Sequence, residues 1–426
     1  MINSKLKQDT ISERLNSLTL YEKGWTASTR LDAKSRLLDT GLPTRRAEYW
    51  KYTRPDKFLG PVAPLVSVNE DREGPIFDEL DCIKIVFVDG VFSDVLSDNL
   101  HLSGGSLELI SATKNLDKHW AEDLYGSLEL GGQDPVKRPL AVLNTAYAEE
   151  GILLNVKQGI SKPLSLHYVH RSELSDVMLR HVIKLEKGAS VTILESGAVG
   201  ARSNVVFEVE IGPGATLNHI RAQGRDHERC TANHIFSKLG QASQFKSFTL
   251  SMNGVLTRNE TVIDISGDDA VAHVAGASLG DGAFHHDDTV FITHDAVRGE
   301  SRQVFKKVLK NGASGVFQGK ILVKPGAQKT DGYQISQSLL LDDDSQFLAK
   351  PELEIYADDV ACSHGSTSGA VDEEARFYLC SRGIPADEAT NMLTLAFVSE
   401  ALAEIESEEI TEIIQERLES WLSRGS

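Results

Sequence analysis

The 426-residue sequence has few cysteines and no long apolar segment. Its four cysteines (Cys82, Cys230, Cys362 and Cys380) are too sparse for a disulfide framework, and no CxxC pair supports a self-contained four-thiolate zinc or cluster site. No run of about 18 apolar residues occurs, which excludes an ordinary transmembrane helix. The first ten residues carry no apolar core of the signal-peptide kind. We therefore expect a soluble, cytoplasmic protein with free thiols.

Basic residues and familiar enzyme signatures are also in short supply. Lys and Arg number 44 against 62 Asp and Glu, which gives a net charge of −18. Because a chain of this charge repels a phosphate backbone, we expect no nucleic-acid partner. The sequence contains no phosphate-binding loop, no dinucleotide-binding glycine fingerprint and no Gly-x-Ser-x-Gly elbow. These absences exclude the commonest nucleotide-dependent and hydrolase architectures.

The first 150 residues are predicted to form a domain of mixed helices and strands. Apolar residues recur at helical spacing in Ser12–Leu20 and Ser28–Leu38. Ile83–Val88 is a short apolar run that ends at a turn, which predicts a strand. Asp117–Leu130 predicts a further helix.

Residues 151–371 have a different character, with short apolar segments between turns and no long helical period. A small residue recurs after a turn and before each expected strand. The alanines of this repeat are at positions 189, 215, 242, 270 and 313, with spacings of 26, 27, 28 and 43. A sheet-only repeat of this size predicts a β-solenoid, whose coils stack to bury their inner faces. A β-sandwich, which also uses irregular Gly-Ala turns, is the alternative.

Residues 372–426 are predicted to form a helical module. Asp372 can cap a helix over Glu373–Ser381, and two more helices follow. The last helix carries an apolar stripe, formed by Ile410, Ile413, Ile414, Leu418 and Leu422. The stripe could pack on its own domain, or the module could lie beyond the last coil as a cap or docking surface.

Two clusters carry metal-ligand chemistry. The first is His285–Asp288 with His294 and Asp295, whose imidazoles and carboxylates suit zinc or iron. Neighbouring side chains on a strand point to opposite faces, so His285 and His286 would not meet one ion without a bulge. A solvated turn is the favoured interpretation of this cluster.

The second cluster lies in Asp358–Gly365. In an extended segment, Cys362 and His364 project to the same face because they are two residues apart. A thiolate beside an imidazole suits iron or sulfur chemistry, but two ligands cannot complete a tetrahedral site. Any remaining ligands would have to come from elsewhere, plausibly from another chain. The alternative is a buried cysteine next to a hydrogen-bonded histidine.

Several motifs resemble the SufB/SufD family of iron–sulfur cluster assembly scaffolds. The C-terminal motifs are Ser301–Phe305, Gly312–Lys320, Gln328–Tyr333, Ala357–Ser366 and Phe377–Ile384. Two N-terminal motifs, Gly41–Arg45 and Glu48–Thr53, resemble the SufD branch. The resemblance covers most of the chain.

This resemblance implies a mainly β fold, a right-handed parallel β-helix over residues 151–371, flanked by domains over residues 1–150 and 372–426. It implies a non-catalytic scaffold subunit that pairs with a SufB-type scaffold and docks a SufC-type ABC ATPase through its C-terminal helices. His364 and, less strongly, Cys362 match the family's candidate ligands for a nascent cluster at the SufB interface.

The same resemblance implies a transient iron–sulfur cluster at that interface and no cofactor bound tightly to the isolated chain. It gives no role to Cys82, Cys230 or Cys380. Because an open solenoid edge invites strand pairing, we expect the isolated chain to form a symmetric homodimer.

A metal-dependent carbohydrate-active enzyme on a β-helix is the rival interpretation, with the cluster from His285 to Asp295 as its site. Such enzymes usually line an open groove with aromatic residues and are often secreted. Aromatic residues make up only 7% of this sequence, which disfavours the enzyme.

Overall fold

The computed structural model describes residues 12–68, 76–223, 228–252 and 254–423. The expectation about a signal sequence concerns residues outside these ranges. Two sheets dominate the fold, a ten-stranded sheet A and a nine-stranded sheet B. No described helix is long and apolar enough to cross a membrane.

In spatial order, sheet A contains β19 (Val360–Gly369), β17 (Thr330–Leu340), β15 (Glu300–Lys310), β13 (Val271–Asp281), β11 (Gln244–Met252), β9 (Thr216–Gln223), β7 (Ser190–Gly197), β5 (Leu164–Val169), β1 (Ile83–Val88) and β2 (Val91–Phe92). Sheet B contains β18 (Gln346–Ile355), β16 (Ser314–Val323), β14 (His285–His294), β12 (Leu256–Ile265), β10 (Cys230–Leu239), β8 (Arg202–Ile211), β6 (Asp176–Leu185), β4 (Ile152–Val156) and β3 (Gly105–Leu109).

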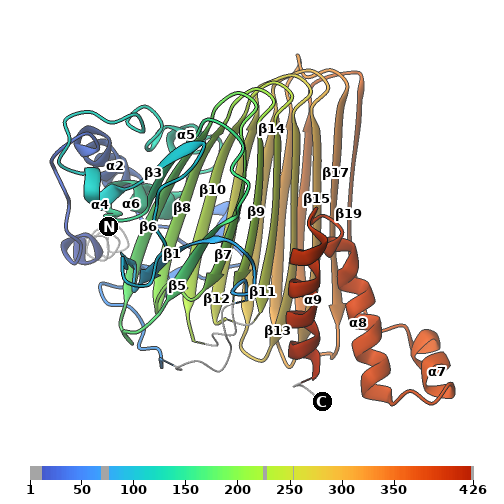
Figure 1. Ribbon diagram of the computed structural model, residues 1–426. Coiled ribbons are helices and arrows are strands. Elements are labelled where there is room, and N and C mark those ends of the chain that lie inside the picture. Colours follow the sequence, from blue (N-terminus) through green and yellow to red (C-terminus); the bar gives the residue numbers. More distant parts are fainter. Residues whose placement is uncertain (1–11, 69–75, 224–227, 253, 424–426) are drawn as a thin grey trace.

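The chain passes alternately between the two sheets from β4 to β19, and neighbouring strands within each sheet are parallel over this range. This coiling confirms the β-solenoid, which Figure 1 shows from the side. The sandwich alternative is wrong, because a sandwich of that kind is built from antiparallel strands. Inward-facing apolar side chains such as Leu166, Ile193 and Phe207 form the main core, and their burial contributes about 25 cal/mol per Å².

The alanine repeat marks one turn of several coils, but at Ala242 the predicted position is shifted by one residue from the buried one. Ala189, Ala215 and Ala270 are buried directly before strands of sheet A. Ala242 is exposed at a φ of 52°, and Ser243 takes the buried position instead. Ala313 precedes a strand of sheet B, so the spacing of 43 joins opposite edges of the solenoid.

The sheets begin before residue 151. β1 lies at the predicted Ile83–Val88 and pairs in parallel with β5, while β3 pairs antiparallel with β4. The helical elements of this region are α2 (Ala27–Thr40), η1 (Glu48–Trp50), α3 (Asp56–Leu59), α4 (Ile110–Thr113), α5 (Ser127–Gly131) and α6 (Pro139–Tyr147). Residues 12–16 are also helical. The helix predicted at Ser28–Leu38 is confirmed by α2.

The helix predicted over Asp117–Leu130 is wrong. Only α5 forms there, and it starts after Gly126, whose φ of 79° breaks the helical path. Residues 117–126 instead contribute turns and an apolar cluster around Trp25 and Tyr125. Tertiary packing in this segment overrides the local helical pattern.

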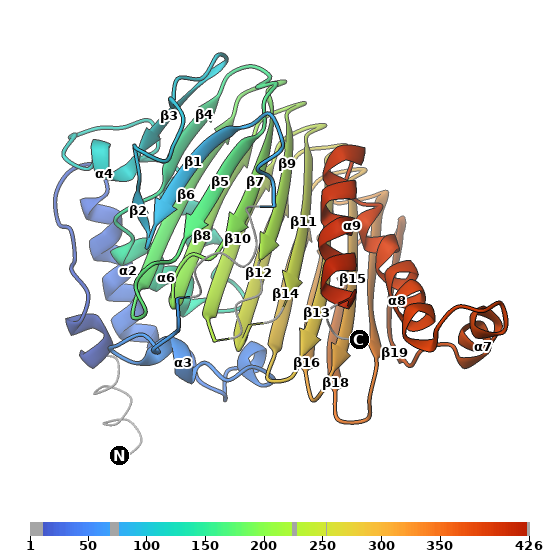
Figure 2. The same ribbon diagram turned by 60° about the horizontal axis from the view of Figure 1, so that its bottom comes forward.

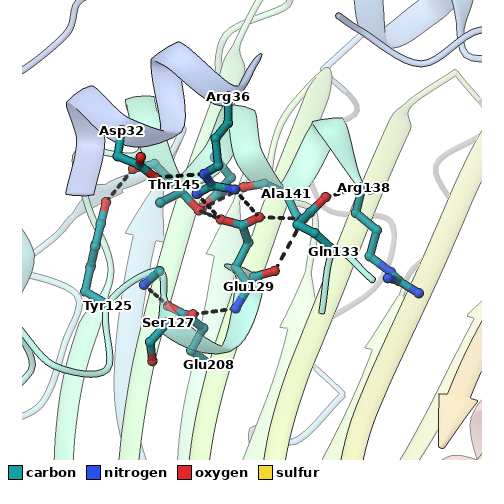
Figure 3. A network of polar contacts seen from close by, with 12 residues as sticks. Asp32, Arg36, Tyr125, Ser127, Glu129, Gln133, Arg138, Ala141, Thr145 and Glu208 are labelled. Atoms are coloured by element: carbon teal, nitrogen blue, oxygen red, sulfur yellow. Dashed lines mark hydrogen bonds and ion pairs between the residues drawn. The ribbon is translucent and has the colours of Figure 1, made fainter. Parts of the chain in front are cut away.

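The N-terminal helices cover the outer face of sheet B through a buried polar network (Figure 3). Glu129 on α5 is fully buried and accepts hydrogen bonds from Arg36, at 2.9 and 3.1 Å, and from the Thr145 hydroxyl at 2.9 Å. Glu208 on β8 accepts the Glu129 backbone N–H at 2.9 Å and pairs with Arg180 at 2.6 Å. Since an unpaired buried charge is unfavourable, the two layers are held in one arrangement.

The segment around η1 extends this cover along the solenoid. The Tyr49 carbonyl accepts hydrogen bonds from Arg258 on β12, at 2.9 Å, and Gln318 on β16, at 3.2 Å. The Tyr49 hydroxyl donates to Glu352 on β18. We call residues 48–53 the strap, because they connect the N-terminal helices to the last strand of sheet B.

The C-terminal helices are α7 (Glu373–Ser381), α8 (Ala386–Leu402) and α9 (Glu408–Ser423). The Asp372 side chain caps α7, as predicted, by accepting the backbone N–H groups of Glu374 and Ala375. α8 contacts β13 and β15 on the outer face of sheet A. The module therefore folds back along the sheet instead of lying beyond the last coil (Figures 1 and 2).

Candidate functional site

The end of the solenoid is formed in sheet A by β19, which pairs with β17 and has no second strand partner among the described residues. Strand alternation places four small or polar side chains on its inward face: Cys362, His364, Ser366 and Ser368. Their register partners on β17 are Gly332, Gln334, Ser336 and Ser338. Hydrogen bonds of 3.1 and 2.8 Å join the two pairs of serines. The inner face of the last strand is therefore polar from His364 onward, while Val360 and Cys362 pack against an apolar cluster.

Cys362 is half-buried at this end. It packs against a small apolar cluster that includes Ile321 and Ala327. Burial raises the pKa of the Cys362 thiol, while a hydrogen bond with the Gly332 backbone acts in the opposite direction. A Cβ at position 332 would lie 3.2 Å from the Cys362 sulfur, so the glycine leaves room for the thiol.

His364 is exposed, two residues further along the same face. The strand geometry thus bears out the shared face of Cys362 and His364. No group of three or more His, Cys, Asp or Glu side chains that could hold a metal occurs within the described ranges. Two side chains leave the coordination of a metal ion incomplete.

The cluster from His285 to Asp295 is not a solvated turn, and that expectation is wrong. His285–His294 is the strand β14, and His286 and Asp288 face the solenoid interior. The Lys307 ammonium lies 2.8 Å from His286 Nδ1 and 2.7 Å from an Asp288 oxygen. Burial, together with the charge of Lys307, holds the pKa of His286 well below its usual value.

The alternate side chains of β14 face outward, as the strand rule requires. Asp287 pairs with Arg258 at 2.5 Å and accepts a hydrogen bond from Thr53 of the strap. The hydroxyl of Thr53 also lies 3.0 Å from His285 Nε2. All three carboxylates of the cluster have cationic partners within the chain, Asp287 with Arg258, Asp288 with Lys307 and Asp295 with Lys324, which disfavours the metal site of the rival carbohydrate-active enzyme.

A second polar cluster lies inside the early coils. Glu195 on β7 receives hydrogen bonds from Arg221, at 2.9 Å, His219, at 2.6 Å, and Tyr168, at 2.8 Å. Burial opposes the charge, but Arg221 and His219 outweigh it and lower the pKa of Glu195 to about 2. The Glu195 carboxylate therefore has its counter-charge within the chain, and Tyr168, Glu195 and Arg221 line a small pocket at this point of the solenoid.

The remaining cysteines lie away from these clusters. Cys230 is buried beneath the N-terminal helices, and burial raises its pKa to about 11. Cys82 and Cys380 are half-buried, the first beside β1 and the second on α7. A thiol held protonated by burial is a poor nucleophile or ligand, which applies most strongly to Cys230.

The helical module has a buried apolar stripe on α9 and an exposed helix, α7, at its tip. The stripe on α9 packs on the outer face of sheet A through Ile410, Ile414, Leu418 and Leu422, so it covers the neighbouring β-solenoid domain and is not a free docking surface. No residue of α7 is buried; Phe377 is 75% exposed and Tyr378 is 57% exposed. Both views show α7 at the tip of the module, away from the sheets (Figures 1 and 2).

Comparison with known proteins identifies the family of this solenoid. A family model described as "SUF system FeS cluster assembly, SufBD core domain" matches residues 168–397, more than half of the chain. The chain belongs to the SufBD core family. The matched range contains β6 to β19 and most of α8, so the family core consists of the coils and the first two C-terminal helices.

Named relatives of this SufBD chain extend the match over nearly its whole length. The iron–sulfur cluster assembly protein SufD of Escherichia coli is 27% identical over 401 residues, covering 92% of each chain. SufD of Bacillus subtilis is 24% identical over 425 residues, covering 95% of each. Protein ABCI7, chloroplastic, of Arabidopsis thaliana is 26% identical over 402 residues, covering 88% of this chain and 81% of its own.

Sequence reasoning missed two features of this SufBD solenoid. The motif at residues 48–53 does not by itself predict where the strap lies on the solenoid, and the sequence around Gln303 and Gln334 does not by itself predict that these glutamines are buried behind His364. The second omission had a usable signal, because the register places Gln334 30 residues before His364, just as Gly332 precedes Cys362. Writing the coils under one another would have aligned these positions.

Proposed function

We propose that this chain is a non-catalytic scaffold subunit for iron–sulfur cluster assembly, of the SufD type. The observation that carries the proposal is the pairing of a thiol and an imidazole, Cys362 and His364, on the inner face of the last strand of a SufBD solenoid. Relatives named as iron–sulfur cluster assembly proteins support it.

In this proposal the nascent cluster is cargo. His364 supplies an imidazole nitrogen and Cys362 supplies a thiolate, both suited to iron. Since two ligands are insufficient, a SufB-type scaffold pairing at the β18–β19 end supplies the others. The isolated chain holds no cofactor tightly and forms a symmetric homodimer through the same edge. We place this assembly in the cytoplasm.

The second partner is a SufC-type ABC ATPase, in which the ATPase activity resides. Its docking surface is α7 within the 372–426 domain, because α9 is occupied by sheet A and α7 is not. An exposed aromatic pair is the kind of anchor that dominates protein interfaces. Phe377 and Tyr378 fit this role.

Reconstitution of the three-subunit complex tests the cluster site. With iron, a sulfide donor and ATP, the His364→Ala variant should lose most cluster formation, measured by visible absorption and electron paramagnetic resonance. Cys362→Ala should lose less, and Ser366→Ala is the matched control from the same face. Cluster formation by His364→Ala at the wild-type rate, with all subunits present, would overturn the site.

The ATPase surface is tested separately. Phe377→Asp should abolish co-purification of the ATPase while leaving the melting temperature unchanged, because the side chain is exposed. Leu38→Asp, at a 54% exposed position on α2, is the matched control at the opposite end. Equal retention of the ATPase by both variants would remove α7 from the proposal.

A further inference from the structure

One inward-facing row of sheet A runs the length of the solenoid and ends at His364. Strand register connects its members one by one, in the order Ile83, Leu164, Ile193, His219, Ser247, Val274, Gln303, Gln334 and His364. The row is apolar where it begins and consists of two amides and an imidazole where it ends. Its last three positions therefore form a polar ladder with His364 at the open end.

Gln334 is fully buried directly behind His364. Its Nε2 donates to Gln303 Oε1 at 2.9 Å. Its Oε1 has no hydrogen-bond partner among the described residues. A buried acceptor without a partner is unfavourable, so this oxygen is available to a donor that can reach it.

The surrounding chain keeps space for this amide. A Cβ at Gly319 on β16 would lie 2.2 Å from Gln334 Nε2. Any other residue at position 319 would therefore displace the glutamine. Gln303 accepts this hydrogen bond, and its own Nε2 has no partner among the described residues, so turning over Gln334 alone would bring two carbonyl oxygens together.

The geometry points to His364 as the partner. Adjacent parallel strands lie about 4.8 Å apart, and register partners share a face. Gln334 Nε2 is occupied by Gln303 on β15, so Oε1 is the atom left for a donor; His364 is exposed and does not reach it in this structure, and the contact requires the imidazole to turn inward. We propose that Gln334 is a positioning residue, which accepts a hydrogen bond from a ring N–H of His364 and so selects one imidazole tautomer.

The consequence concerns the second ring nitrogen. When one nitrogen of a neutral imidazole donates, the other keeps its lone pair. Histidines that ligate metals usually donate their other N–H to an oxygen behind them, which fixes the ring. Gln334 would thus direct the free nitrogen of His364 toward the interface. The ligand role rests on the proposed function, whereas the hydrogen bond is a property of this chain alone.

The decisive measurement is the tautomer of His364 in the isolated full-length chain. Long-range proton–nitrogen NMR of ¹⁵N-histidine-labelled protein, with the His364 signals assigned from the His364→Ala variant, reports which ring nitrogen carries the proton. We expect a single tautomer in the wild type. Gln334→Met keeps the length of the side chain without the amide. In this variant, His364 should show both tautomers, in the proportions found in free imidazole side chains.

Two further variants keep the result interpretable. Gln303→Met leaves the amide of Gln334 in place but releases its orientation, so an intermediate mixture is expected. Ser336→Ala changes the next inward position on β17 and should leave the tautomer unchanged. If Gln334→Met leaves a single tautomer, the proposal is wrong, whatever happens to cluster formation. If Gln334→Met fails to fold, an unchanged tautomer in folded Gln303→Met overturns it instead.

In the reconstituted complex, Gln334→Met should slow cluster formation about tenfold, the usual effect of removing such a supporting group. A changed tautomer with undiminished cluster formation would support the hydrogen bond and count against His364 as a ligand. The two proposals can therefore fail independently.

Discussion

The two ends of the solenoid use one backbone geometry for opposite purposes. Near the start, the inner row of sheet A holds Leu164 and Ile193, which are fully buried. At the other end, the same row holds Gln334 and His364. Inside the early coils, the Glu195 carboxylate accepts hydrogen bonds from Tyr168, His219 and Arg221, whereas the amide oxygen of Gln334 in the last coils has no partner among the described residues. The early coils therefore enclose a charged network, whereas the inward row of the last coils ends in a neutral amide and an exposed imidazole.

The largest loss of stability should come from breaking the buried ion pair between Glu208 and Arg180, beneath the N-terminal helices. Glu208→Gln leaves Arg180 as a buried cation without its counter-charge, so the free energy of unfolding should fall by about 3–5 kcal/mol in chemical denaturation. Glu210→Gln is the control on the same strand, since its partner Lys184 is exposed and its loss should stay under about 1 kcal/mol. Equal losses would show that burial does not distinguish these pairs.

The inner row provides the next test. Ile193→Ala opens a cavity in the apolar part of the row and should lower the free energy of unfolding by about 2–5 kcal/mol. Ser336→Ala, on the inner face near the open end, removes one hydroxyl and should lower it by about 1 kcal/mol. If the serine variant were the less stable, the open end would be the better-packed region.

The strap joins the two ends, and its effect should be smaller. Burial and the Glu352 carboxylate raise the pKa of the Tyr49 hydroxyl well above its usual value, so the hydroxyl remains a donor. Tyr49→Phe should lower the free energy of unfolding by about 1.5–3 kcal/mol. Faster amide hydrogen exchange in β18 would locate the loss. Unchanged exchange there would mean that the strap does not brace the last coil.

The regularity of a solenoid explains which parts of the fold were predictable. The repeat, the capped helix at Glu373–Ser381 and the shared face of Cys362 and His364 all follow from local spacing. The buried state of His286 and Asp288 does not, because it depends on Lys307 arriving from the next coil. The fold-back of α8 and α9 depends on the outer face of sheet A, whose apolar residues are indistinguishable from inner ones in the sequence.

The smallest effect should appear where the helical module meets sheet A. His273 on β13 lies 3.0 Å from Glu404 and 3.1 Å from Glu300. Burial alone would lower the pKa of His273, but the hydrogen bonds to these two carboxylates outweigh it and raise the pKa. Stabilisation by the protonated ring is therefore complete below the unfolded-state pKa of about 6.5 and disappears as the pH rises through the higher folded value.

His273→Gln tests this contact. The variant should be less stable than the wild type by about 1 kcal/mol near pH 5.5, and the difference should vanish by about pH 9. Denaturation curves at both pH values measure it. A difference that grows with pH would reverse the assigned sign and imply that His273 acts as a neutral ring.

The composition of β19 determines how strongly this edge of sheet A can pair with another strand. The strand reads Val-Ala-Cys-Ser-His-Gly-Ser-Thr-Ser-Gly, with no large apolar side chain. The side of β19 that faces away from β17 offers backbone N–H and C=O groups to another strand but little of the apolar surface that drives aggregation. Strand pairing at the edge of β19 should therefore be weak and reversible. A second strand can therefore pair at this edge and be exchanged for another without a large apolar surface becoming exposed in between.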